Sequence, residues 1–446
     1  MTTRYSRDMR GYGRRAPDPQ WPNPGGTGSA KLCVQFVVNY EEGGENAVIH
    51  GDKASEAFLS EIVGAQSWPG QRHMNMESIY EYGARAGFWR LHRLFTERAM
   101  PVTVYGVATA LERSPEQVAA MQKADWEIAS HGLKWIDYRD HSREAERADM
   151  AEAIATHEAV TGERPLGWYT GRSSEHTLEL CGERDFLYVS DSYADDLPYW
   201  QETEAGPLLV LPYTLDTNDM RFATPQGFNT GEQFFTYLKD SFDMLYAEGE
   251  AGAAKMLNVG LHCRLAGRPG RAAALERFLD YVRSKPDVWV ATRAAIALHW
   301  RTRFPFRPGI RPSRLERPVF LAMFGGVYEH SPFVAERAFD RGLGAAHDTA
   351  AGLAGAMAAA FRRASVEERL GVLRSHPDLA GRLALVGDLT QASRDEQRSA
   401  GLDALSEEEL ARFQDLNARY VARFGFPFIL AVKGPTGRGL DRDAII

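Results

Sequence analysis

The sequence predicts an α/β protein followed by a smaller all-α domain. From Lys31 to about residue 300, short runs of β-branched and aromatic residues alternate with longer amphipathic runs, a pattern typical of a largely parallel sheet with helices. Seven or eight strands over ~270 residues is the size of a (β/α) barrel. Beyond about Pro312 the pattern is helical only. A chain of 446 residues is also too long for one ordinary core.

Eight runs are predicted to be strands, and three long runs between them are predicted to be helices. The strand candidates are residues 31–40, 101–108, 126–130, 165–170, 186–193, 208–216, 255–263 and 288–292. Helical periodicity is clearest in residues 77–99, 142–162 and 231–251.

Changes in composition mark the domain boundaries. Residues 1–30 are predicted to form an N-terminal extension and residues 31–300 the α/β domain. Residues 301–317 carry many arginines and prolines, which discourage regular structure and indicate a linker. Residues 318–446 are predicted to form the helical domain. Three of its helices are expected to begin with capping boxes, made by Ser365 with Glu368, Ser393 with Glu396 and Ser406 with Glu409.

Composition and charge favour small-molecule chemistry. Hydrophobic residues make up 44% of the chain, and a net charge of −8 offers no field to gather nucleic acid or anionic lipid. Cys33, Cys181 and Cys263 are far apart and form no CxxC pair, which indicates neither a disulfide framework nor a zinc-thiolate site. The sequence shows no apolar signal region and no run of about 18 apolar residues. We therefore expect a cytoplasmic protein that takes small-molecule substrates and binds neither nucleic acid nor membrane. We also expect a homo-oligomer, although composition does not indicate how many subunits it has.

Polar residues gather just past the ends of the predicted strands. They are Glu41, Glu42, His131, Asp191, Asp195, Asp196, Asp216, Asp219 and His262. In a barrel these strand ends share one rim, where the active sites of such folds lie. Taken alone, two adjacent glutamates are more often solvated surface charge, and a single histidine is as often part of the core. The shared position at strand ends favours the functional interpretation.

The order of these motifs resembles the polysaccharide-deacetylase superfamily: NYEEG ends one strand, SHGLKW another and VGLHC a late one. The resemblance implies a distorted barrel in which Glu41 corresponds to the general base, Glu42 to a metal-binding acid, His131 to a metal-binding histidine and His262 to the general acid. Trp135 stands where the superfamily has its second metal-binding histidine. One imidazole replaced by indole leaves too few ligands for a divalent centre, so neither a metal nor another cofactor is expected.

Longer segments are similar to the metal-independent allantoinases recruited from this superfamily. They are RYSRDMRGYGRRAPDPQWP, FVVNYEEGGEN, RHMNMESIYEYGARAGFWRL, SHGLKWIDY and HCRLAGRPGRAAALERF. This resemblance spans roughly residues 4 to 300 and implies hydrolysis of the hydantoin ring of (S)-allantoin to allantoate. Trp135, Arg172, Asp216 and Arg264 are the candidates for substrate binding. Trp135 is alternatively core filler.

The residue types suit this chemistry. Opening a cyclic amide requires water to attack a carbonyl, an anion to be stabilised and a proton to reach the leaving nitrogen. Two carboxylates in one pocket raise each other's pKa, which keeps one proton available. His131, His262, Arg172 and Arg264 are the candidate hydrogen-bond donors. The sequence leaves open whether Glu41 or Glu42 activates the water.

In the helical domain, FGGVYEHSPFVAE, RSHPDLAG, SRDEQRSAGL and LNARYVARFGFPFILAVKG resemble the decarboxylase of 2-oxo-4-hydroxy-4-carboxy-5-ureidoimidazoline (OHCU). The match covers about residues 318 to 433. By position His376 corresponds to the proton donor and Glu396 to its acidic partner, although Glu396 also suits a capping box with Ser393. The substrate contacts implied are Pro377, Ser393, Arg394, Asp395, Gln397, Phe428, Ile429, Leu430, Ala431 and Val432.

The decarboxylase family usually continues with a further helix beyond the point where this chain stops, at Ile446, so we expect this domain to be truncated at its C-terminus. The chain as a whole is predicted to be a bifunctional enzyme of purine catabolism, in which the second domain makes (S)-allantoin from OHCU and the first hydrolyses it. The alternative is a metal-dependent carbohydrate or peptidoglycan N-deacetylase with a non-catalytic helical module.

Overall fold

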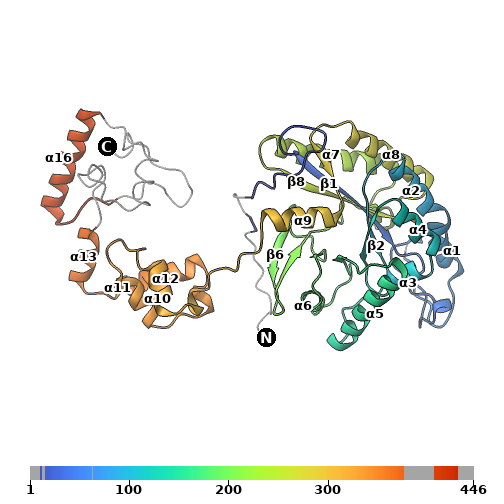
Figure 1. Cartoon of the computed structure of the whole chain (residues 1–446), viewed down its shortest axis with the longest axis horizontal. Helices are drawn as coiled ribbons and strands as arrows, with labels where there is room; N and C mark the ends of the chain where they lie inside the picture. Colours follow the sequence, from blue (N-terminus) through green and yellow to red (C-terminus); the bar gives the residue numbers. More distant parts are fainter. Residues whose placement is uncertain (1–10, 13–15, 63, 376–405, 430–446) are drawn as a thin grey trace. The chain divides into compact units, whose positions relative to one another are not determined.

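The computed structural model describes residues 11–12, 16–62, 64–375 and 406–429. The chain divides into two compact units, one up to Phe306 and one from Arg307 onward. The first is an α/β body and the second is helical (Figure 1). This agrees with the fold class that the sequence predicts.

The first unit is built on one curled sheet. Its strands are β1 (Leu32–Tyr40), β2 (Thr103–Gly106), β3 (Glu127–Ser130), β4 (Gly167–Trp168), β5 (Tyr188–Val189), β6 (Tyr199–Glu202), β7 (Pro207–Val210), β8 (Lys255–His262) and β9 (Val288–Val290). The order is β6-β7-β5-β4-β3-β2-β1-β8, and β9 also pairs with β1. All pairs are parallel except β6 with β7. A bridge between Asn218 and Gly260 brings the segment after β7 against β8, as in a distorted barrel.

Helices follow most strands. They are α1 (Met74–Tyr82), α2 (Phe88–Thr96), α3 (Ala108–Glu112), α4 (Pro115–Lys123), α5 (Arg143–Thr161), α6 (Thr177–Gly182), α7 (Gly231–Glu250), α8 (Pro269–Arg283) and α9 (Arg293–Arg303). Side chains that precede α5, α7 and α9 cap them: Ser142, Thr230 and Thr292 each accept a hydrogen bond from the first turn. The predicted helix over residues 77–99 is interrupted by a π-helical turn, Gly83–Gly87, which separates α1 from α2.

The register of the central strands defines the functional rim. All nine residues of β1 are buried, as its continuous apolar sequence requires for a strand covered on both faces. Tyr40 lies beside Gly106 of β2, and Gly106 lies beside Ser130 of β3, while Asn39 pairs with His262 of β8. The residues that follow these strand ends therefore meet at one edge of the sheet.

Two glycines let the π-helical turn approach this edge closely. A Cβ atom on Gly83 would lie 2.2 Å from Oε1 of Glu42, and one on Gly87 would lie 2.0 Å from the carbonyl oxygen of Cys263. Any larger residue would push the helix away from the carboxylate and from the loop after β8. The turn therefore forms one wall around the Glu42 side chain.

The described part of the second unit contains helices and no strand. They are α10 (Arg317–Phe324), α11 (Phe333–Asp340), α12 (Ala350–Arg362), α13 (Val366–Ser375) and α16 (Glu407–Phe424). Helices α10, α11 and α12 share a cluster of buried residues that includes Phe320, Val334 and Met357. Ser365 with Glu368 and Ser406 with Glu409 form the predicted capping boxes, and the third pair, Ser393 with Glu396, lies outside the described residues.

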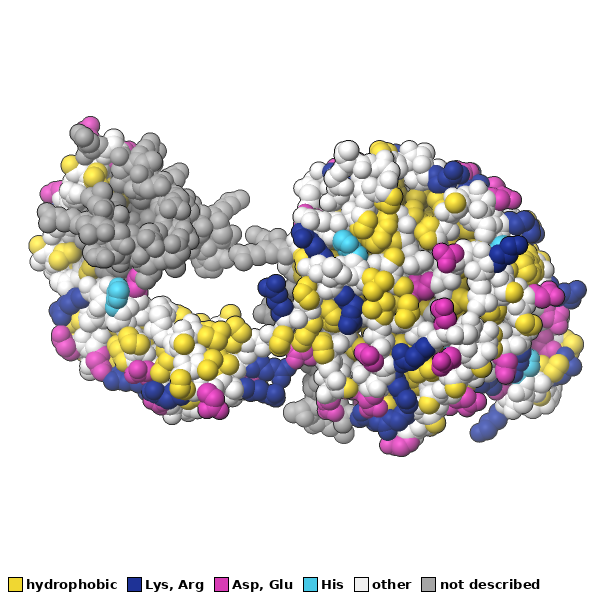
Figure 2. Space-filling model, viewed as in Figure 1, with side chains coloured by type: hydrophobic (Ala, Val, Ile, Leu, Met, Phe, Trp, Pro, Cys, Tyr) yellow, Lys and Arg dark blue, Asp and Glu magenta, His cyan; other side chains and the backbone are white. Residues whose placement is uncertain are grey.

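The distribution of surface charge and the state of the cysteines are as the composition predicts. On the face in Figure 2, basic and acidic side chains are interspersed over the larger unit. All three cysteines are buried and unpaired. None of the helices in the described ranges is both long and apolar enough to cross a bilayer.

Candidate active site

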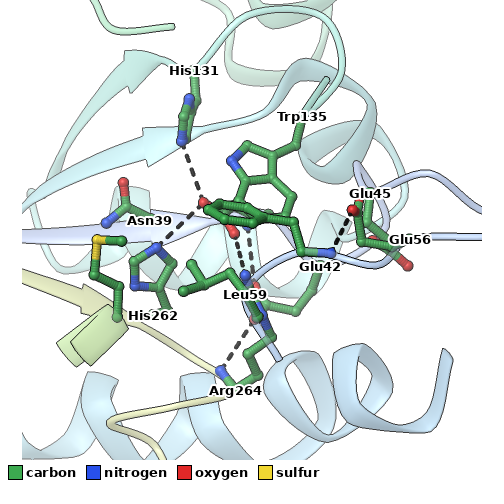
Figure 3. A network of polar contacts seen from close by, with 12 residues as sticks. Asn39, Glu42, Glu45, Glu56, Leu59, His131, Trp135, His262 and Arg264 are labelled. Carbon is green, nitrogen blue, oxygen red and sulfur yellow. Dashed lines mark hydrogen bonds and ion pairs between the residues drawn. The ribbon is translucent and has the colours of Figure 1, made fainter. Parts of the chain in front are cut away.

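Glu41 is the centre of a buried polar cluster at the rim of the sheet. Figure 3 shows other members of this cluster, among them His131, His262 and Arg264. Glu41 follows β1 directly and is 1% exposed. One carboxylate oxygen, Oε1, lies 3.4 Å from Nε2 of His131 and 3.4 Å from Nε2 of His262. The other, Oε2, lies 2.6 Å from Nη2 of Arg264. The sheet therefore brings together four of the side chains that the sequence singles out.

The electrostatic environment keeps Glu41 ionised. Burial alone would raise the pKa of this carboxyl group, because the charged form loses its water. The charges of Arg264 and His262, with hydrogen bonds from both histidines, outweigh burial and hold the pKa well below its usual range. Glu41 is thus a carboxylate at neutral pH.

The pKa of the neighbouring acid, Glu42, is shifted in the opposite direction, upward. Its side chain turns back under the strand end, where Oε2 accepts a hydrogen bond from the backbone N–H of Glu41 at 3.1 Å and Oε1 accepts one from the N–H of Arg264 at 3.2 Å. Burial raises the pKa of Glu42 to about 7, with Arg264 acting against this rise and the charge of Glu41 adding to it. Two adjacent acids therefore differ in protonation near neutral pH, as a site that needs both a base and a proton donor requires.

His262, the last residue of β8, is oriented by Asp219. Its Nδ1 lies 2.6 Å from Oδ1 of this buried carboxylate, and its backbone N–H donates to Oδ2 at 2.7 Å. Ala266 N–H donates to the same oxygen at 2.8 Å. Burial lowers the pKa of an imidazole, but Glu41 and Asp219 prevail and raise that of His262 to about 9. His262 therefore carries a proton at neutral pH.

His131 approaches Glu41 from the opposite side. It follows β3, is 2% exposed, and has its Nδ1 3.2 Å from the carbonyl oxygen of Tyr169. This contact holds one side of the imidazole and leaves Nε2, 3.4 Å from Oε1 of Glu41, directed at the carboxylate. The ring of Tyr169 lies 4.9 Å from the imidazole and restricts its rotation.

Trp135 and Arg264 are in contact within the same cluster. The backbone N–H of Trp135 donates to Gly44 at 2.8 Å, which fixes the loop after β3 against the loop after β1. The Arg264 guanidinium carbon lies 4.3 Å from the ring of Tyr80 and 5.2 Å from that of Trp135. Arg264 Nε donates to the carbonyl of Leu59 at 3.3 Å.

The other predicted substrate-binding residues lie farther out. Arg172 donates to the carbonyl oxygen of Trp135 at 2.5 Å, and its guanidinium carbon lies 4.3 Å from the centre of the Trp135 ring. Arg172 therefore holds Trp135 in place. Asp216 is exposed and accepts hydrogen bonds from Thr214 and Tyr237, so the structure does not bring it into the Glu41 cluster. Asp219, three residues later, is the acid that reaches the cluster.

The residues present do not fit the divalent ion that the superfamily resemblance implies. Among the described residues no group of three or more His, Cys, Asp or Glu side chains is arranged to hold a metal. Arg264 contacts Oε2 of Glu41 and lies 3.7 Å from Oε1 of Glu42, which places a permanent positive charge against both acids. The indole of Trp135, at the position of the missing histidine, donates no lone pair to a metal.

Most of the predicted second site falls outside the described residues: His376, Pro377, Ser393, Arg394, Asp395, Glu396, Gln397, Leu430, Ala431 and Val432. Phe428 and Ile429 are described and are partly buried after the end of α16. The ring of Phe428 lies 5.3 Å from that of Tyr420. This contact anchors the GFPF segment to α16.

Comparison with protein families divides the chain in the same way as its fold. Residues 76–180 match the family described as polysaccharide deacetylase, and residues 313–443 match that of OHCU decarboxylase. An OHCU decarboxylase of Haloferax volcanii is 46% identical over 121 residues, which is 27% of this chain and 68% of that protein.

Two solved structures are similar to the first unit along their whole length. The crystal structure of a "probable Polysaccharide deacetylase from Pseudomonas aeruginosa PAO1" is 57% identical, with a TM-score of 0.65, and covers 68% of this chain and 100% of its own. The crystal structure of the allantoinase PuuE is 54% identical, with a TM-score of 0.66, and covers 68% of this chain and 99% of its own.

The contact between Asp219 and His262 predicts a pH-dependent effect. Asp219→Asn removes a negative charge 2.6 Å from the ring, so the pKa of His262 should fall below about 9. Because the folded state raises this pKa, the protonated ring stabilises the fold fully below about pH 6.5 and loses this contribution as the pH rises through about 9. NMR titration of the imidazole and denaturation at pH 6 and pH 9.5 would measure both effects.

The variant should lose more stability at pH 6 than at pH 9.5. Asp216→Asn, in the same loop but exposed, is the matched control and should leave the His262 titration unchanged. An unchanged His262 titration in Asp219→Asn would contradict the assignment.

Proposed function

The chain belongs to the polysaccharide deacetylase family in its first unit and to the OHCU decarboxylase family in its second, and from this premise we propose that it is a bifunctional enzyme of purine catabolism. Residues 31–300 hydrolyse the hydantoin ring of (S)-allantoin to allantoate. Residues 318–446, joined to them by the segment 301–317, decarboxylate OHCU to (S)-allantoin. The two reactions are consecutive.

The observation that carries the first half is the 54% identity to a solved allantoinase over nearly its whole length. The geometry of the rim supports it. Within one buried cluster lie a carboxylate (Glu41), a carboxyl group that titrates near neutrality (Glu42) and a protonated imidazole (His262). These are the groups that ring opening by water needs when the metal ligands are incomplete.

Each group has a role in the proposed reaction. Glu41 accepts a proton from water as the oxygen attacks the ring amide carbonyl, and the oxyanion that forms is stabilised by a donor such as His131. The carbon–nitrogen bond then breaks, and His262 gives its proton to the leaving nitrogen. The products are a carboxylate and a free ureido group. The proton that Glu41 took from water passes to His262, whose Nε2 lies 3.4 Å from Oε1 of Glu41, and the proton of the new carboxyl group is released by way of Glu42.

The second reaction needs neither metal nor an organic electron sink. Loss of CO2 leaves an electron pair on carbon, which the electron-poor ring of the substrate holds. The protein has to orient the carboxylate and deliver one proton to one face, a task for which a histidine such as His376 is suited. Glu396 is its acidic partner. The substrate contacts predicted around Pro377, Ser393 and Phe428 belong to this proposal.

The alternative, a metal-dependent N-deacetylase of carbohydrate or peptidoglycan, is less well supported. It needs a divalent ion where Trp135 offers no ligand and Arg264 already pairs with the acids. A reducing cytoplasmic location, consistent with three unpaired cysteines, and assembly into homo-oligomers are parts of the same proposal.

A single assay tests the hydrolase half. The purified protein, treated with a chelator and checked for residual metal by elemental analysis, is supplied with (S)-allantoin. We expect allantoate to form at a rate that added Zn²⁺ or Co²⁺ does not increase. Absence of turnover with and without metal would contradict allantoin hydrolysis, and turnover only with metal would favour the deacetylase-like alternative.

Substitutions should separate the two activities. Glu42→Gln and His131→Ala are each expected to lower allantoin hydrolysis by about 10²–10⁴-fold, since each removes a group used in proton transfer or charge stabilisation. Both should leave OHCU decarboxylation intact. His376→Ala should have the reverse effect. Glu276→Gln, on the outer helix α8, is the control for a lost carboxylate and should change neither rate.

A further inference from the structure

Arg264 takes no part in the proton transfers proposed above. It is nevertheless the most deeply buried cation of the Glu41 cluster. Its side chain is 0% exposed. A guanidinium group remains protonated in proteins, and a buried charge is costly unless it is paired. Its partners are the two adjacent acids, with Nη2 2.6 Å from Oε2 of Glu41 and Nη1 3.7 Å from Oε1 of Glu42.

Two aromatic rings hold this guanidinium in place. Its central carbon lies 4.3 Å from the Tyr80 ring centroid and 5.2 Å from that of Trp135, both within about 6 Å, the range of cation–π attraction. The Leu59 carbonyl accepts from Nε at 3.3 Å. Tyr80 and Trp135 are themselves buried, at 2% and 5% exposure. These two rings therefore form an aromatic clamp around the guanidinium group of Arg264, and burial leaves the rings little freedom to move apart.

The position of Trp135 in the sequence indicates what this clamp replaces. In the superfamily this position carries a histidine that binds the divalent ion, and here it carries an indole. An indole ring attracts a cation through its face instead of through a lone pair. The ring of Trp135 therefore stabilises an organic cation at a position where an imidazole binds an inorganic one.

We propose that the guanidinium of Arg264, clamped by Trp135 and Tyr80, is the fixed cation of this site and takes the role that a divalent ion has in metal-dependent members of the superfamily. It binds Oε2 of Glu41, which leaves Oε1 directed at the two imidazoles, and it balances the charge of the paired acids. Arg264 is a positioning residue in this role. The inference rests on the proposed hydrolase function.

The first test removes the charge and keeps the length of the side chain. Arg264→Met should lower kcat for allantoin hydrolysis by ~100-fold or more with little change in KM, in line with the loss of one electrostatic group from a buried site. In Arg264→Ala, guanidinium chloride at tens of millimolar should restore part of kcat, and sodium chloride at the same ionic strength should not. Arg98→Met removes a largely buried arginine that is ion-paired with Glu276 and Asp280, away from the Glu41 cluster, and should behave as the wild type.

The second test asks whether guanidinium and metal are interchangeable. The double variant Trp135→His/Arg264→Ala should bind one Co²⁺ per chain in calorimetry, and the wild type and Arg264→Ala should not. Circular dichroism confirms that each variant is folded before it is measured.

The outcomes separate this inference from the proposed function. A folded Arg264→Met that keeps more than a tenth of the wild-type kcat would overturn the inference and leave the hydrolase function standing. So would failure of guanidinium to restore Arg264→Ala, or a folded double variant that binds no Co²⁺. A wild-type protein that hydrolyses no allantoin would contradict the proposed function itself.

Discussion

Two adjacent carboxyl groups are buried at the end of β1, and this constraint determines the rest of the first site. Glu41 and Glu42 are 1% and 3% exposed. Two carboxylates buried to this extent without positively charged partners would destabilise the fold strongly. The protein stabilises the pair by placing Arg264 against both and the protonated His262 against one. The same neighbours make the acids unequal: Glu41 stays ionised, whereas the pKa of Glu42 rises to about 7. Stability and acid–base chemistry thus arise from one set of contacts.

The sheet supplies this arrangement through its strand order. β1 lies between β2 and β8, and its register pairs Asn39 with His262, so the acids and the late histidine are neighbours before any loop is considered. Arg264 is the second residue after β8, and Gly83 and Gly87 let the π-helical turn pack closely against Glu42 and against the loop after β8. A barrel rim gives such a site a fixed backbone, because each functional side chain begins at or just after the end of a strand.

Much of this architecture is predictable from the sequence because it follows from local patterns. All eight predicted strands occur, since buried strands of a parallel sheet have continuous apolar runs. β6 was not predicted: it is short and partly exposed, and its pairing with β7 is antiparallel. The π-helical turn was also missed, because GARAG continues the helical period on either side of it.

The sequence predicts most of the residues that meet at the candidate site, but it predicts their individual roles less well. Convergence of Glu41, Glu42, His131 and His262 follows from their places at strand ends. The choice between Asp216 and Asp219 depends on which side chain the turn after β7 directs inward, and only Asp219 reaches His262. Arg264 is a candidate both for substrate binding and for hydrogen-bond donation, and the structure places it against the two acids. Which acid holds a proton depends on burial and on neighbouring charges, which no local pattern encodes.

The two units relate through chemistry, since the product of the reaction proposed for the second is the substrate of the reaction proposed for the first. The most direct test supplies ¹³C-labelled OHCU to the intact, chelator-treated chain and follows the label by NMR. We expect (S)-allantoin to appear and then to be replaced by allantoate, with no other enzyme added. Two results would contradict the proposed pair of activities. One is accumulation of allantoin without allantoate, and the other is loss of OHCU no faster than in a sample without protein.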